Sequence, residues 1–192
     1  MNENIKITQT ELLSDNWYRL NKVTYQYRKK NGEWETQVRE AYDRGNGATI
    51  LLYNTEKKTI ILTRQFRLPT YVNGNEDGMM IEACAGLLDE NNAEDCIRKE
   101  TEEETGYKVS KVQKIFEAYM SPGSVTEIVH FFIAEYAEEM KVGDGGGLAE
   151  EQENIEVLEL DFEAAYNMIA KGKIKDGKTI MLLQYAKLQG LL

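Results

Sequence analysis

Three glutamates, Glu100, Glu103 and Glu104, lie close together in the sequence and are of a type that binds metal ions. On a helix, residues four apart project from the same face, so Glu100 and Glu104 come together with Glu103 beside them. Like charges so placed repel, whereas Mg²⁺ accepts carboxylate oxygens and completes its shell with water and substrate phosphates. The cluster indicates a magnesium site for phosphate chemistry. A solvated acidic helix face is the alternative interpretation.

The elements around these glutamates favour the metal site. An apolar strand is expected at 79–85, followed by a turn at Gly86. Asn92 is a good helix N-cap and Gly106 supplies the left-handed residue that often ends a helix, so the sequence predicts a helix between them. The turn brings the backbone carbonyl of Ala85 to the metal beside the carboxylates.

The rest of the chain is richer in strands than in helices. We expect a hairpin from strands 23–27 and 33–42 across a turn at 29–32, further strands at 48–53, 59–66, 109–119, 127–136 and 155–160, a mobile connection at 143–147, and helices at 162–170 and 179–188. Runs of strands interrupted by a few helices favour an α+β fold, a mixed-sheet α/β/α sandwich, over a doubly wound parallel sheet.

Composition limits the possible partners and the compartment. The 192 residues carry a net charge of −10, from 33 acidic and 23 basic residues, which argues against nucleic acid as a partner. No segment has the length and apolarity of a membrane helix, no targeting segment is evident, and Cys84 and Cys96 are expected to be reduced buried thiols. We expect a cytoplasmic protein without membrane contact.

His130 is the only histidine and is expected to be a satisfied core or cross-strand residue, which disfavours Ser-His-Asp and Cys-His enzymes.

The acidic segment resembles the box of the Nudix hydrolases, G-x5-E-x7-R-E-U-x-E-E-x-G-U. The matching residues are Gly86, Glu100, Glu103, Glu104, Gly106 and Tyr107. The segment is one residue shorter before the Arg-Glu position, and it has Asn92 for the first Glu, Lys99 for the Arg and Thr101 for the aliphatic residue.

A second likeness lies outside the box. Pro122 follows Gly106 by sixteen residues, as in the sugar-nucleotide branch of the family that is typified by ADP-ribose pyrophosphatases. Within this branch the chain is most similar to the members that cleave GDP-mannose. That likeness rests on residues 43–54, 64–67, 72–76, 119–123, 130–136 and 176–179.

The resemblance implies a Nudix domain at 44–192 and an N-terminal antiparallel β region at 1–43 that is exchanged between the subunits of a homodimer. It implies hydrolysis of the diphosphate of a nucleoside diphosphate sugar with Mg²⁺, or with Mn²⁺ in its place. The expected substrate is GDP-mannose, with GMP and mannose 1-phosphate as products. Two alternatives remain: an ADP-ribose pyrophosphatase, and a non-catalytic nucleotide-binding module. The preferred base and sugar stay open, because specificity depends on a few contacts spread over loops.

The same resemblance implies roles for particular residues. The expected metal ligands are the Ala85 carbonyl, Glu100, Glu104 and Glu153, and the expected catalytic residues are Glu103 and Glu153. Glu150 and Glu151 lie in the same loop as Glu153 and are alternatives to it. The expected substrate-binding residues are Trp17, Val38, Arg39, Glu40, Arg67, Ala85, Gly86, Leu87, Glu104, Glu127, Glu153 and Lys178.

Overall fold

The computed structural model of the protein describes residues 2–88 and 92–192. The chain divides into two compact units. The first consists of Met1–Asn46 and Tyr119–Ile128, and the second of Gly47–Ala118 and Val129–Leu192.

The first unit is built on a three-stranded antiparallel sheet. Its strands are β1 (Ile5–Asp15), β2 (Arg19–Arg28) and β3 (Trp34–Asp43), and they lie in this order. The β2–β3 turn contains Gly32 at φ +88°, a conformation that glycine adopts without strain. The predicted hairpin is therefore confirmed, and β1 extends it to a sheet.

The second unit contains a seven-stranded mixed sheet. Its main path runs β10 (Glu156–Asp161), β5 (Thr59–Phe66), β4 (Gly47–Asn54), β9 (Ile128–Glu135) and β8 (Gln113–Tyr119). Strand β6 (Met79–Glu82) pairs with β5, and β7 (Cys84–Leu87) pairs with β4. The β4–β9 pairing is parallel, whereas β5 pairs with β4, β6 and β10 in antiparallel fashion.

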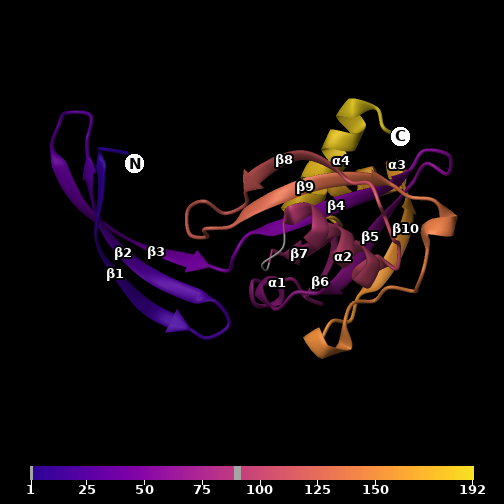
Figure 1. Cartoon of the computed structure of the whole chain (residues 1–192), viewed down its shortest axis with the longest axis horizontal. Coiled ribbons are helices and arrows are strands. Elements are labelled where there is room, and N and C mark those ends of the chain that lie inside the picture. Colours follow the sequence, from indigo (N-terminus) through magenta and orange to yellow (C-terminus); the bar gives the residue numbers. More distant parts are fainter. Residues whose placement is uncertain (1, 89–91) are drawn as a thin grey trace. The chain divides into compact units, whose positions relative to one another are not determined.

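Helices cover both faces of this sheet. Helix α2 (Ala93–Thr105) and helix α4 (Gly177–Gln189) both contact β4, and they lie on opposite sides of the sheet (Figure 1). On one face, Ala48, Ile50 and Leu52 of β4 form a core with Ile97 of α2. Helix α3 (Phe162–Ala170) packs against β10 and α4, and α1 (Leu68–Val72) is a single short turn. The predicted mixed-sheet α+β sandwich is confirmed.

Three local predictions differ from the structure. The expected strand at 79–85 is two strands that pair with different neighbours, interrupted at Ala83, whose N–H donates to Thr179 Oγ1 at 2.7 Å. The strand expected from 109 begins at Gln113, and Val109 is buried in the core ahead of it. Helix α1 was not predicted, although Pro69 at its start suits a first helical turn.

No helix among residues 2–88 and 92–192 combines the length and apolarity needed to span a bilayer.

Candidate active site

Helix α2 begins and ends where the sequence predicted. The Asn92 side chain accepts hydrogen bonds from the N–H groups of Glu94 and Asp95, and Gly106 ends the helix at φ 78°. Asn92 therefore caps the helix at the position where the Nudix box has its first Glu. Thr101, at the aliphatic position of the box, is fully buried and its hydroxyl donates to the Ile97 carbonyl at 2.6 Å.

Glu104 is a buried carboxylate that faces strand β7. It is 2% exposed, and its Oε2 accepts a hydrogen bond from the Ala85 N–H at 3.3 Å. Burial, together with the charges of Glu100 and Glu153, raises the pKa of Glu104 to about 8 against the opposing hydrogen bonds with the Cys84 thiol and the Ala85 N–H. The charges of Glu100 and Glu153 therefore both act on the buried Glu104 carboxylate.

Gly86 lets the backbone of β7 approach α2 closely. A Cβ at this position would lie 2.2 Å from Glu100 Cδ, so any other residue would displace that carboxylate. Together with the buried Glu104, this cradle offers hard oxygen donors, which fit Mg²⁺. Within the part of the chain that the structure describes, no three His, Cys, Asp or Glu side chains already stand in metal-binding geometry. Glu103, the third glutamate of the acidic helix, pairs through Oε2 with Lys99 Nζ at 3.3 Å.

The glycine segment 143–147 is bonded to the C-terminal end of α2. The Gly146 N–H donates to the Glu104 carbonyl at 2.9 Å, and the Gly147 N–H donates to the Glu103 carbonyl at 3.1 Å. A Cβ on Gly145 would lie 2.5 Å from the Glu104 carbonyl oxygen. The segment expected as a mobile connection is hydrogen-bonded to the end of the helix, where its glycines supply N–H groups to carbonyls that have no partner within the helix.

The end of this segment, together with Leu148 that follows it, contacts the side chain of Glu153. The Leu148 N–H donates to Glu153 Oε2 at 3.0 Å, and a Cβ on Gly147 would lie 2.4 Å from that oxygen. Glu150 is exposed in the short turn η2 (Ala149–Glu151). The charge of Glu153 is among the causes that raise the pKa of Glu104.

Arg67 and Lys178 meet at a buried carboxylate, Glu82, which is not among the predicted site residues. Arg67 Nε donates to Glu82 Oε2 at 2.7 Å, and Lys178 Nζ lies 3.9 Å from Glu82 Oε1. Lys178 Nζ also donates to Asp176 Oδ1 at 2.7 Å. Glu82 is the only charged residue in the apolar stretch 79–85, and a charge within an otherwise apolar strand is the signal that could have identified it.

The remaining substrate-binding candidates lie in two places. Leu87 ends β7 and is half-buried. The others belong to the first unit, where Trp17 is 83% exposed, Val38 is 44% exposed, and Glu40 lies on β3. Arg39 Nη1 donates to the Val38 carbonyl at 2.7 Å. In the same unit, Glu127 Oε1 lies 3.5 Å from Arg44 Nε.

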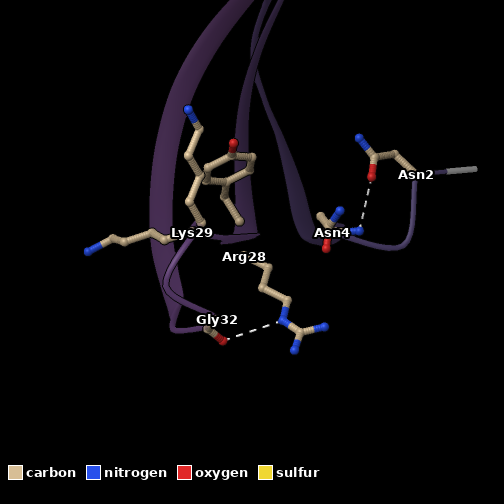
Figure 2. Close-up of a pocket in the computed structure, with 7 residues that line it drawn as sticks. Asn2, Asn4, Arg28, Lys29 and Gly32 are labelled. Carbon is tan, nitrogen blue, oxygen red and sulfur yellow. Dashed lines mark hydrogen bonds between the residues drawn. The ribbon is translucent and has the colours of Figure 1, made fainter.

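An open hollow at the β2–β3 turn of the first unit contains none of the predicted site residues. It is lined by Asn2, Asn4, Tyr27, Arg28, Lys29, Lys30 and Gly32, with Arg28 Nε donating to the Gly32 carbonyl at 3.4 Å (Figure 2).

The cysteines and the histidine can be compared with the roles expected for them. Cys84 and Cys96 are buried free thiols, as predicted. His130 is half-buried on β9 with its Nδ1 3.2 Å from Glu117 Oε2 of β8, which is the cross-strand position expected for it.

Comparison with known proteins covers nearly the whole chain. Residues 43–183 match the model of the NUDIX domain, and residues 4–42 match that of the GDP-mannose pyrophosphatase NudK N-terminal domain. The chain is 60% identical over 192 residues to the GDP-mannose pyrophosphatase of Yersinia enterocolitica, covering 100% of both chains. It is 60% identical over 190 residues to that of Pectobacterium atrosepticum, covering 99% of this chain and 97% of the relative. It is 56% identical over 192 residues to that of Salmonella arizonae, again covering 100% of both.

Proposed function

Because this chain belongs to the Nudix family of hydrolases, we propose that it cleaves the diphosphate of a nucleoside diphosphate sugar, with GDP-mannose as substrate and GMP and mannose 1-phosphate as products. The observation that carries this proposal is the packing of Gly86 against Glu100 beside the buried Glu104. The full-length relatives named GDP-mannose pyrophosphatase support the choice of substrate.

Nudix hydrolases generally use divalent metal ions, and we assign Mg²⁺, with Mn²⁺ as its substitute, to this one. The residues that would hold the metal are Glu100, Glu104, Glu153 and the Ala85 carbonyl. When bound, the metal supplies charge neutralisation for phosphate oxygens and a lowered pKa for the attacking water. Glu104 is the ligand that gains most from this charge, because it is buried beside two other carboxylates.

The chain's own residues then have separate tasks. Glu153 is held by the Leu148 N–H beside Glu104, where its carboxylate can accept a proton from water. Glu103 orients the water from the edge of the cluster. Arg67 and Lys178 contribute positive charge and N–H donors toward the phosphates and the sugar hydroxyls. Gly86 and Leu87 present their backbone to the substrate beside Ala85.

We further propose that the protein is a homodimer in which the N-terminal region, 1–43, is exchanged and the domain 44–192 carries the metal. Trp17, Val38, Arg39 and Glu40 would then bind the nucleotide of the partner's site, with Glu127 accepting hydroxyl groups. The exposed apolar side chains of the three-stranded sheet support a partner surface, since Ile7, Leu12 and Trp17 are 69%, 54% and 83% exposed. The two free thiols fit the cytoplasmic location that we assign to it.

A sugar-nucleotide panel tests the function. Purified protein is incubated with GDP-mannose, ADP-ribose and other nucleoside diphosphate sugars in Mg²⁺ or in EDTA, and products are resolved by chromatography and by phosphate release through an added phosphatase. We expect GMP and mannose 1-phosphate to form fastest, and only with metal. Preferential cleavage of ADP-ribose would favour the alternative enzyme. Binding without turnover in Mg²⁺ would favour the non-catalytic module.

A further inference from the structure

Glu82 is a carboxylate inside the protein with a cation at each oxygen. It ends β6, its side chain is 6% exposed, and it receives Arg67 Nε at 2.7 Å on one oxygen and Lys178 Nζ at 3.9 Å on the other. A charge so buried is stable only when it is paired. The two cations come from opposite ends of the second unit's sequence, Arg67 from the end of β5 and Lys178 from the start of α4.

The contact with Glu82 leaves much of Arg67 available. The backbone of Arg67 is fixed, because its N–H donates to the Gly78 carbonyl at 2.8 Å and its carbonyl accepts from the Thr70 N–H at 3.0 Å. A guanidinium has five N–H donors, of which Nε provides one. Over residues 2–88 and 92–192, Glu82 is the only carboxylate paired with Arg67, through Nε, and the side chain is 40% exposed. The Nη groups therefore remain for a ligand with paired oxygens.

Lys178 is held from both sides. Its Nζ pairs with Asp176 at 2.7 Å as well as with Glu82, and Asp176 also caps α4 through the Thr179 N–H at 2.9 Å. The Thr179 hydroxyl in turn accepts from the Ala83 N–H at 2.7 Å. The segment 82–83 is thus joined to the start of α4 by two links, and Ala85 follows on the next strand.

We propose that Glu82 is a positioning residue for substrate binding. It fixes the two cations at a set distance from the strand that carries the Ala85 carbonyl, and it relieves the repulsion between them before the substrate arrives. Two positive and two negative groups, Arg67 and Lys178 with Glu82 and Asp176, make this set neutral without substrate. The inference rests on the proposed function, since the ligand of these cations is the diphosphate or the sugar of a nucleoside diphosphate sugar.

Glu82→Gln tests the proposal, because it keeps the shape of the side chain and removes its charge. We expect the KM for GDP-mannose to rise roughly tenfold, the effect of ~1.4 kcal/mol in binding, while kcat and the Mg²⁺ concentration for half-maximal activity change little. Glu82→Asp keeps the charge and should recover part of the loss. If Glu82→Gln folds poorly, Glu82→Asp carries the test, with a smaller rise in KM.

Glu156→Gln is the matched control. Glu156 lies in the same sheet and pairs with Arg64 at 3.3 Å, but its side chain is 57% exposed. We expect its KM to equal that of the wild type. In addition, Glu82→Gln should add little to Arg67→Ala, because both changes remove the same arrangement. An unchanged KM in Glu82→Gln, or additive effects in the double variant, would overturn the proposal.

A spectroscopic readout separates this inference from the proposed function. In a ¹⁵N-labelled sample, the Arg67 Nε–H signal is assigned by its loss in Arg67→Ala. We expect it to exchange slowly with water in the wild type and in Glu156→Gln, and rapidly in Glu82→Gln. A signal that stays protected in Glu82→Gln contradicts the positioning role, whereas a wild type that cleaves no sugar nucleotide contradicts the proposed function alone.

Discussion

The buried carboxylate of Glu104 lowers the stability of the metal-free protein, but it suits the binding of a metal ion. Its carboxylate is 2% exposed and lies in the field of Glu100 and Glu153. Burying a charge costs free energy unless an opposite charge compensates it. In the metal site that we propose, a divalent cation would supply that compensation, and metal binding and stability would then be linked at this one side chain.

The Glu104→Gln variant makes this linkage measurable. The pKa of Glu104 is raised to about 8 in the folded protein from a usual value of 4.5, so its contribution to stability is present below pH 4.5 and is lost as pH rises through about 8. In EDTA at pH 8, we expect Glu104→Gln to melt above the wild type, by about 2–4 °C for each ~1 kcal/mol recovered by removing the buried charge.

Adding Mg²⁺ should reverse this order, because only the wild type gains a metal ligand. We expect the melting temperature of the wild type to rise with Mg²⁺, that of Glu104→Gln to stay nearly constant, and hydrolysis by the variant to fall by roughly 100-fold or more. Equal Mg²⁺ shifts in the two proteins would remove Glu104 from the metal site. Glu156→Gln, at an exposed carboxylate, serves as the control.

At the scale of elements, α2 and the glycine segment 143–147 form one structural piece. The segment's N–H groups bind the carbonyls of Glu103 and Glu104, and it leads directly to the residues that hold Glu153. Only glycines permit this approach, because Gly145 lies at φ +68° and its Cβ would meet a helix carbonyl. The loop carboxylate is therefore positioned by the end of the acidic helix.

Comparing Gly145→Ala with Gly172→Ala isolates this packing. The two glycines have similar φ values, +68° and +65°, but nothing lies within 4 Å of a Cβ on Gly172. Both variants should lose ~1 kcal/mol from the strained backbone, and Gly145→Ala about 1–3 kcal/mol more from the clash, together with much of its kcat. Denaturant unfolding and steady-state kinetics measure the two effects. Equal losses in both would show that the contact with α2 has no role.

Several elements could be predicted from local sequence, and others could not. Helix α3 has the predicted bounds, and the ends of α2 follow from Asn92 and Gly106, because capping depends on neighbouring residues only. The break between β6 and β7 could not be read from the sequence. Residues 79–85 are uniformly apolar apart from Glu82, and the break arises because the two halves pair with different strands.

For the whole molecule, the proposed exchange of the N-terminal region makes each active site depend on two chains. Glu104 and Arg39 would then serve the same site from different subunits. A C2 dimer built in this way has two such sites, each with one copy of either residue. The exposed apolar side chains of the three-stranded sheet would provide the surface for that association.

Subunit complementation tests this arrangement. Glu104→Gln and Arg39→Ala chains, each inactive alone, are co-expressed with different tags, and the mixed dimer is isolated. In an exchanged dimer both defects fall in one site and the other site is intact, so we expect about half of the wild-type activity. An inactive mixed dimer would mean that each chain completes its own site, and sedimentation of the active protein as a monomer would exclude the dimer.

The sequence by itself determined the family, the strand-rich α+β class and the acidic helix, because box spacing, caps and hydrophobic periodicity are local properties of the chain. It also identified Arg67 and Lys178 as candidates for binding phosphate. Only the tertiary structure decided that both meet at Glu82 and that the segment 143–147 closes the end of α2. These contacts join residues far apart in the sequence, where spacing carries no information about distance, and burial determines which charges must be paired.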